Sequence, residues 1–241
     1  MGDPVHSQGA GLVCVAIAAE ATAVDPQAEA LAAAREAEAK ADVIEIRLDS
    51  IPQPDTGLFM RELSRPLLFT NRPKWEGGSY AGDEGGRIGL LLDAIAANVA
   101  YVDIEVKTEY DLRQEVIARA GEGQTRTIVS WHNFAETPSG VVLEDIFNEQ
   151  YASGARIGKI VTMAHDSGDV LRVLALQLLA AERDFPLIAF CMGRAGMISR
   201  LATVELGGYM TYAAPDSGRA TAPGQLRVSA LRSMLNTLNN S

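Results

Sequence analysis

Short apolar runs rich in β-branched residues recur along this chain of 241 residues at fairly even intervals. Runs of this length and composition are typical of strands that are buried on both faces. They cover residues 12–19, 42–49, 66–72, 101–106, 127–132, 156–163, 186–192 and 209–213. The pattern therefore predicts eight strands.

The segments between these runs carry apolar residues at spacings of three and four, which is the period of an amphipathic helix. Asp25 can cap the first such segment, with Pro26 in its first helical position. The helical segments are 25–41, 86–98, 109–120, 141–152, 168–183 and 225–238, with shorter candidates at 56–63 and 198–206.

A strand followed by a helix, repeated eight times, predicts an α/β fold of the (β/α)8 TIM barrel type. We expect a single domain over residues 1–241, with 1–11 as a short N-terminal extension, because no Pro/Gly/Ser-rich linker divides the chain. A doubly wound open sheet uses the same alternation. It is disfavoured because residues 18–22, which follow the first run, lack a glycine-rich phosphate-binding turn.

Composition and charge exclude several classes of partner. A net charge of -10 argues against a nucleic-acid partner, because phosphate binding needs a basic face. No apolar stretch is long enough for a membrane helix, so no membrane partner is expected. Cys14 and Cys191 lie in apolar runs and are predicted to be buried thiols, which with the absence of a signal peptide favours a cytoplasmic location.

Lys159 stands inside the strand-like run 156–163. A lysine in a barrel strand must desolvate its ammonium, which is costly unless the group is paired or becomes neutral. A neutral amine is a nucleophile that can form an imine with a ketone. His132 ends the preceding strand and is a candidate for proton transfer. The two residues on neighbouring strands predict Schiff-base chemistry.

Other polar residues cluster at the carboxyl ends of predicted strands, where barrel enzymes have their active sites. Glu45, Arg47 and Asp49 alternate with apolar residues, so they share one side of a strand. They would either bind a hydroxylated ligand or form an internal ladder of salt bridges. Arg72 is placed to bind a hydroxyl or a carboxylate, and Glu76 can orient His132, unless residues 72–78 form a solvated loop.

The last two strands are followed by a second polar group. Arg200 could bind a carboxylate or be an exposed residue at a helix start. Thr221 and Gln225 could close over the same carboxylate or form a turn that caps the last helix. No histidine or cysteine cluster has metal-ligand spacing, so neither a metal nor another cofactor is expected. His6 and His165 receive no role.

Taken together, these motifs resemble those of the type I 3-dehydroquinate dehydratases, the Schiff-base enzymes of the shikimate pathway. The similarity covers nearly the whole chain from Leu12 onward, and the motifs occur in the family's order and spacing. The matching segments are 45–49, 70–78, 101–105, 130–138, 154–160, 192–200 and 222–225.

The resemblance implies syn-elimination of water from 3-dehydroquinate to give 3-dehydroshikimate, the third step of the shikimate pathway in aromatic amino-acid biosynthesis. It also implies a homodimer, because the family often dimerises. The resemblance further implies that Lys159 forms the imine, that His132 acts as general base and acid, and that Glu76 pairs with His132. It implies that the ring hydroxyls are bound by Glu45, Arg47 and Arg72, and the carboxylate by Arg200, Thr221 and Gln225. Met192 and Tyr212 would line the pocket.

The chain departs from the family pattern in several places. Asn133 replaces the usual aspartate after the histidine, and Asn71 replaces an aromatic or apolar residue. Tyr212 stands where phenylalanine is common, and Thr221 where serine is common. The segment before Leu12 is short for the hairpin that closes the barrel bottom in many members.

Two other functions fit parts of the pattern. A class I aldolase that acts on a sugar phosphate would also use a barrel lysine, but it needs a phosphate site in the last two βα loops. A ligand-binding barrel that has lost turnover is the non-enzyme alternative, and Asn133 is the residue that favours it.

Overall fold

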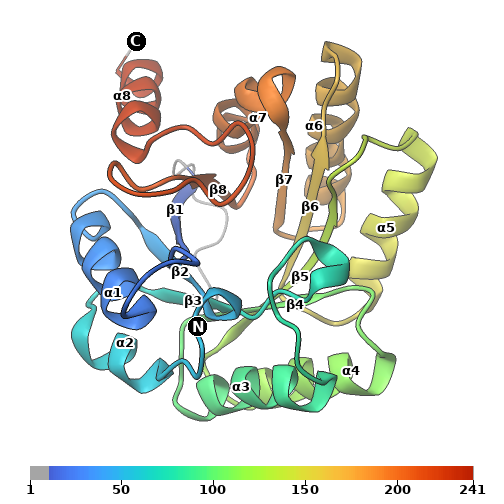
Figure 1. Ribbon diagram of the computed structural model, residues 1–241. Helices are drawn as coiled ribbons and strands as arrows, with labels where there is room; N and C mark the ends of the chain where they lie inside the picture. Colours follow the sequence, from blue (N-terminus) through green and yellow to red (C-terminus); the bar gives the residue numbers. More distant parts are fainter. Residues whose placement is uncertain (1–10, 241) are drawn as a thin grey trace.

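The computed structural model describes residues 11–240, and within them the chain forms one eight-stranded parallel sheet. The order of the strands is β7-β6-β5-β4-β3-β2-β1-β8. The Tyr209 N–H donates to the Leu187 carbonyl across 2.9 Å, which joins the two edge strands and brings the barrel close to closure. Figure 1 shows the helices arranged around the outside of the strands. The predicted (β/α)8 barrel is confirmed.

The strands match the predicted runs in number and place. Their bounds are β1 (Leu12–Ile17), β2 (Val43–Arg47), β3 (Leu67–Thr70), β4 (Tyr101–Glu105), β5 (Arg126–Asn133), β6 (Ile157–Met163), β7 (Leu187–Met192) and β8 (Met210–Ala213). The α-helices are α1 (Pro26–Ala37), α2 (Thr56–Glu62), α3 (Glu84–Ala96), α4 (Tyr110–Gly121), α5 (Gly140–Ala152), α6 (Ser167–Glu182), α7 (Gly193–Glu205) and α8 (Val228–Asn239). Two short 3₁₀ helices, η1 (Leu48–Ser50) and η2 (Lys74–Glu76), follow β2 and β3.

The boundaries of three helices differ from the prediction. The helix predicted at 198–206 begins at Gly193, directly after β7, because the positive φ of 78° at that glycine turns the strand straight into a helix. The predicted 25–41 helix ends at Ala37. The predicted 225–238 helix begins at Val228, because the segment before it forms a separate loop. The Asp25 cap is present, accepting the Ala28 N–H at 3.0 Å.

Two apolar clusters lie between the strands and the surrounding helices, and a third fills the barrel itself. Because side chains alternate along a strand, every second residue of each strand faces the interior. Even-numbered and odd-numbered strands then supply alternate layers. One apolar layer from the odd strands consists of Cys14, Leu68, Ile128 and Ile188.

The next layer toward the carboxyl ends of the strands is polar and comes from the even strands. It consists of Glu45, Asp103, Lys159 and Tyr212. The other three side chains surround Lys159. Its Nζ lies 3.0 Å from Asp103, 3.2 Å from the Tyr212 hydroxyl and 3.8 Å from Glu45. The barrel interior therefore changes from apolar to charged between two successive layers of side chains.

The predicted 1–11 extension lies outside the described residues except for Gly11, and His6 lies outside them as well. Both cysteines are free and buried, as predicted. Within residues 11–240, no helix is both long and apolar enough to cross a membrane.

We expect Phe147→Ala to lower the free energy of unfolding by about 3–5 kcal/mol, because it leaves a cavity in a fully buried site. Phe147 packs edge-to-face against Phe185 with ring centroids 5.8 Å apart. Leu178→Ala on α6 is the control, since that side chain is 72% exposed and should change stability by less than about 0.5 kcal/mol. Urea denaturation of both variants measures the difference, and equal midpoints would contradict the proposed packing.

Candidate active site

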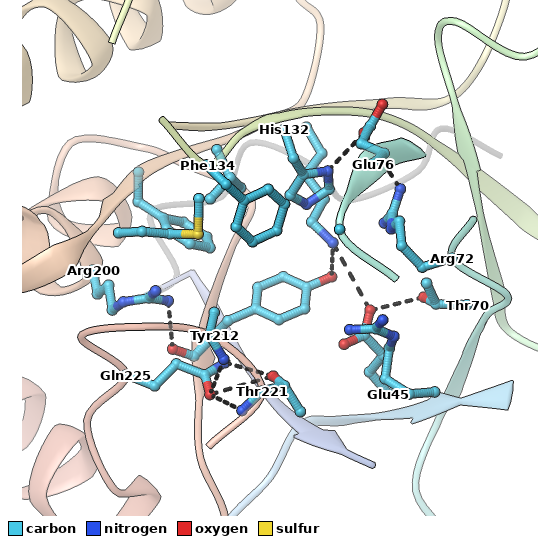
Figure 2. A pocket seen from close by; sticks show the side chains of 17 residues that line it. Glu45, Thr70, Arg72, Glu76, His132, Phe134, Arg200, Tyr212, Thr221 and Gln225 are labelled. Carbon is cyan, nitrogen blue, oxygen red and sulfur yellow. Dashed lines mark hydrogen bonds and ion pairs between the residues drawn. The ribbon is translucent and has the colours of Figure 1, made fainter. Parts of the chain in front are cut away.

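A cavity opens at the carboxyl ends of the strands, with about 480 Å³ of empty space, part of it open to solvent. Eleven of the site residues predicted from the sequence line it, whereas Asp49 does not (Figure 2). These residues are Glu45, Arg47, Arg72, Glu76, His132, Lys159, Met192, Arg200, Tyr212, Thr221 and Gln225. The structure thus brings together residues that are up to 180 positions apart in the chain.

Lys159 lies on β6 with only 4% of its surface exposed. Its own carbonyl accepts a hydrogen bond from the Gln150 side chain of α5 at 2.8 Å, which fixes the strand backbone beneath it. The sequence alone left two outcomes for a buried lysine, neutrality or pairing. The structure shows pairing, because the Asp103 carboxylate lies 3.0 Å from Nζ. Only an unprotonated amine has the lone pair that attacks a carbonyl carbon.

Asp103 received no role from the sequence. It lies two residues before Glu105 on β4, so the two carboxylates face the same side of the strand. It is fully buried and accepts hydrogen bonds from Arg72 at 2.8 Å and from the Ser130 hydroxyl at 2.6 Å. Burial alone would raise its pKa, but Arg72 and then Lys159 hold the pKa of this carboxyl well below its usual range. Asp103 therefore stays ionised and bridges two cations.

Arg72 follows β3 and is buried against protein carboxylates. One nitrogen donates to Glu105 and to the Ser130 hydroxyl, both at 2.7 Å, and lies 3.6 Å from Glu76. The sequence predicted that this guanidinium would grip a ligand. In the structure its donors hold Asp103 and Glu105, so its main observed contacts are internal even though it lines the cavity.

Arg87 extends this ion-pair network to α3, which the sequence did not indicate. It is 0% exposed and pairs with Glu105 at 2.5 Å and with Glu84 at 2.8 Å. Its guanidinium also donates to the Thr108 hydroxyl at 2.9 Å. Glu105 thus joins Arg72 in the barrel to α3 on the outside.

His132 and Glu76 form the predicted pair, with Nδ1 of the ring 2.8 Å from Oε1 of the carboxyl group. Glu76 ends η2, and Gly77 follows it with a φ of 78°. A β-carbon at Gly77 would lie 2.3 Å from the Phe134 ring, so only glycine lets the loop approach this closely. Phe134 in turn stacks on the His132 ring at 6.1 Å between centroids.

The proton affinities of this pair are shifted in opposite directions. Burial, followed by the charges of Arg72 and Lys159, lowers the pKa of His132 well below its ordinary value. Burial raises the pKa of Glu76 to about 8, against the pull of Arg72. Because Nδ1 is occupied by Glu76, the remaining ring nitrogen, Nε2, is the one available for a ligand. A neutral imidazole in this position can accept a proton.

Glu45 and Arg47 both line the cavity, whereas Asp49 lies just beyond the end of β2, in η1. Asp49 accepts two hydrogen bonds from Arg47, at 2.8 Å and 2.7 Å. It also accepts the Ser79 N–H at 2.9 Å, which ties the loop after β3 to β2. The three residues therefore do not all face the lumen: two do, and the third fixes Arg47 and the loop.

Arg200 is the buried cation of this cavity that lacks an acid. It is 1% exposed on α7, and no carboxylate within residues 11–240 forms an ion pair with it. It donates to the carbonyls of Tyr212 and Pro223 at 3.3 Å and 3.4 Å and lies 4.5 Å from the Phe190 ring centroid. Its Nε has no partner among the described atoms, and burial lowers its pKa to about 10.

Thr221 and Gln225 line the same cavity as Arg200 (Figure 2). The Gln225 side-chain oxygen accepts the Thr221 N–H at 2.8 Å, and its amide nitrogen donates to the Thr221 hydroxyl at 3.0 Å. The predicted contact between this loop and the cavity is present, and the same bonds explain why the last helix starts after the loop. Met192 and Phe190 add the apolar part of the wall.

Asn133, the departure that weighed against catalysis, has a local structural role. Its side-chain oxygen accepts the N–H groups of Ala135 and Glu136 at 2.9 Å and 3.1 Å, so it caps the turn after β5. An aspartate could accept the same bonds. The substitution therefore changes the charge near His132 without changing this turn.

The sequence profile of the type I 3-dehydroquinases matches residues 13–241. The chain belongs to this family. It is 44% identical over 192 residues to the 3-dehydroquinate dehydratase of Desulfotalea psychrophila, covering 80% of this chain and 85% of that one. It is 38% identical over 204 residues to the 3-dehydroquinate dehydratase of Methanothermobacter thermautotrophicus, covering 83% and 86%.

A solved structure of a type I 3-dehydroquinate dehydratase from Clostridium difficile, with covalently modified comenic acid, has the same architecture. Its TM-score is 0.85 at 26% identity, covering 97% of this chain and 94% of that one. Among residues 11–240 of this family member, no group of three or more histidines, cysteines or acids is arranged to hold a metal ion.

Acid should destabilise the fold partly through His132. Its folded-state pKa is lowered, so the unfolded chain binds the extra proton first as the pH falls below about 6.5. Between pH 7 and pH 5 this costs up to about 2 kcal/mol of stability. His132→Asn should therefore lose less stability over that range than the unaltered chain, as measured by urea denaturation at both pH values.

The exposed His165 provides the matched control, and His165→Asn should keep the full pH dependence. If His132→Asn and the unaltered chain lost the same stability between pH 7 and pH 5, the imidazole would be protonated in the folded state too.

Proposed function

We propose that this chain is a 3-dehydroquinate dehydratase that removes water from 3-dehydroquinate through an imine on Lys159, giving 3-dehydroshikimate in the shikimate pathway. The observation that carries the proposal is one buried cavity that holds an amine, an imidazole of low proton affinity and an unpaired arginine. A small keto acid with an acidic C–H needs these three groups.

Lys159 would attack the ketone carbon and form a protonated imine. A protonated imine withdraws electrons more strongly than a ketone, so it stabilises the carbanion that elimination requires. Asp103 stays ionised beside Nζ and would stabilise the positive charge of the imine nitrogen, as it stabilises the ammonium in the free protein. The covalent ligand in the C. difficile relative agrees with covalent chemistry in this family.

His132 would take the proton from the carbon next to the imine and return it to the departing hydroxyl. One residue serves both steps if proton and hydroxyl leave from the same face, which is the meaning of syn-elimination. The 2.8 Å contact with Glu76 orients the ring. Burial raises the pKa of Glu76 to about 8, so this carboxyl group binds a proton more readily than an exposed glutamate does.

Substrate binding would combine the cation that has no acid partner with paired charges that also line the cavity. Arg200, with Thr221 and Gln225 of the same cavity, would hold the substrate carboxylate, because a buried guanidinium without an acid gains most from an anion. Glu45, Arg47 and Arg72 would contact the ring hydroxyls, and Met192 and Tyr212 would pack on the ring. Such an elimination moves only protons and water, so it calls for no cofactor. A homodimer and a cytoplasmic location stay predictions.

Borohydride reduction in the presence of 3-dehydroquinate tests the mechanism. We expect a stable adduct on Lys159, identified by peptide mass analysis, at the mass of the dehydrated product. Lys159→Met should give no adduct and no turnover, and Lys40→Met at an exposed site should behave as the unaltered chain. His132→Ala should form the adduct with its water retained and should turn over about 10²-fold or more slowly.

Absence of any adduct in the unaltered chain, with turnover intact, would overturn the imine mechanism while leaving the reaction in place. Absence of both turnover and adduct would overturn the proposed activity.

Arg200→Ala should raise the KM about 10-fold or more with a smaller effect on kcat, because it removes a charged contact to the bound carboxylate. Steady-state kinetics measure the split. Arg194→Ala, an exposed change on the same helix, should leave both constants unaltered. An unchanged KM in Arg200→Ala would argue against the carboxylate site.

A further inference from the structure

Formation of an imine needs proton transfers that the elimination itself does not explain. When the amine adds to a ketone, the nitrogen gains a positive charge and the carbonyl oxygen a negative one. A proton must leave the nitrogen and reach that oxygen to give the neutral carbinolamine, and the oxygen must later depart as water. A group within reach of Nζ that both accepts and donates a proton accelerates these steps.

Three side chains lie near Nζ of Lys159, and they differ in their capacity for this transfer. Asp103, at 3.0 Å, is ionised and engaged with Arg72 and Ser130, so it can accept a hydrogen bond but has no proton to give. Glu45 lies farther away, at 3.8 Å, and accepts the Thr70 hydroxyl at 2.7 Å. Tyr212 places its hydroxyl 3.2 Å from Nζ.

The Tyr212 hydroxyl has the right chemistry as well as the right place. A phenol oxygen accepts a hydrogen bond and donates its own proton at the same time. Since Nζ of Lys159 donates to it, its own proton points away from the lysine. Both residues line the same cavity, so a carbonyl group that reaches Nζ enters the space beside this hydroxyl. Figure 2 shows the Tyr212 ring extending across the middle of the cavity.

The position of the hydroxyl is fixed by its surroundings. Tyr212 is 4% exposed, and its ring packs against Phe190 at 5.8 Å between centroids. Nζ of Lys159 lies 4.3 Å from the ring centroid, so ring and hydroxyl together define where the amine sits. Burial, with the charge of Glu45, raises the pKa of Tyr212 well above its ordinary value, which keeps the phenol neutral.

We propose that Tyr212 is a catalytic residue that relays a proton between the Lys159 nitrogen and the substrate oxygen as the imine forms and as it is hydrolysed. In the forward direction the phenol oxygen accepts the proton from Nζ while its own proton moves to the alkoxide oxygen. The carbinolamine becomes neutral and the phenol is restored, so no phenolate and no external acid is needed. The reverse transfer serves hydrolysis of the product imine. This inference rests on the proposed imine mechanism.

The experiment isolates imine formation from elimination by using His132→Ala as the background. Enzyme in excess is mixed with 3-dehydroquinate and quenched with borohydride at increasing times, and the Lys159 adduct is measured by intact mass. Adding Tyr212→Phe, which removes only the hydroxyl, should slow accumulation of the adduct about 10-fold or more. The final amount of adduct should be the same.

The control is Tyr101→Phe, which removes a buried hydroxyl from another tyrosine of the same interior cluster. Tyr101 bonds to Tyr209 at 2.9 Å and does not line the cavity. The Tyr101→Phe change should leave the rate of adduct accumulation in the His132→Ala background unaltered. A second measurement compares the rate of adduct accumulation in H₂O and D₂O. In His132→Ala with Tyr212 intact, the relay requires slower accumulation in D₂O.

The outcomes separate the two proposals. Equal rates with and without the Tyr212→Phe change, or no solvent isotope effect, would overturn the relay and leave the imine mechanism standing. A slow rate in Glu45→Gln with a normal rate in Tyr212→Phe would assign the transfer to Glu45 instead. Failure to trap any adduct on Lys159 in the unaltered chain would remove the imine mechanism itself.

Discussion

The carboxylate of Asp103 is the group on which the rest of the site depends. It lies at the centre of the barrel between two cations, 3.0 Å from Lys159 and 2.8 Å from Arg72. Burying any one of these charges alone would be strongly unfavourable, and each is stabilised only because the others are in place. Arg72 is shared further with Glu105, and Glu105 with Arg87 on α3. The reactive amine is therefore fixed by a chain of ion pairs that runs from the lumen to the outer helices.

The layered interior of the barrel explains how such charges can be held without unfolding it. Apolar side chains close the lumen below, and the alternation of strand side chains then brings Glu45, Asp103, Lys159 and Tyr212 into one layer. The residues of this layer are at most 4% exposed, so each hydrogen bond in it is stronger than it would be in water. The same burial would favour the proposed imine chemistry, because water would hydrolyse the intermediate early.

Two kinds of charge can be distinguished in the cavity. Lys159, Arg72 and Arg47 have protein carboxylates as partners, whereas Arg200 makes only two long hydrogen bonds to carbonyls. The paired charges fix geometry, and the unpaired one is available to an anion. The His132–Glu76 pair lies on another wall, held by the stacked ring of Phe134. Lys159, His132 and Arg200 thus come from separate elements and converge only in the folded barrel.

The sequence by itself determined the fold class, because eight apolar runs alternating with helical periodicity leave few other architectures. It also predicted the chemistry that is proposed for Lys159 and His132, since an amine in a strand and an imidazole at a neighbouring strand end are rare enough to be specific. Only the tertiary structure decided the state of that lysine: strand alternation places Asp103 toward the lumen but does not say which cation it meets. The same holds for Arg72, whose partners Asp103 and Glu105 lie 31 and 33 residues away, and for the Tyr212 hydroxyl beside Nζ. These pairings depend on the stagger of strands around a closed barrel, which local sequence patterns do not encode.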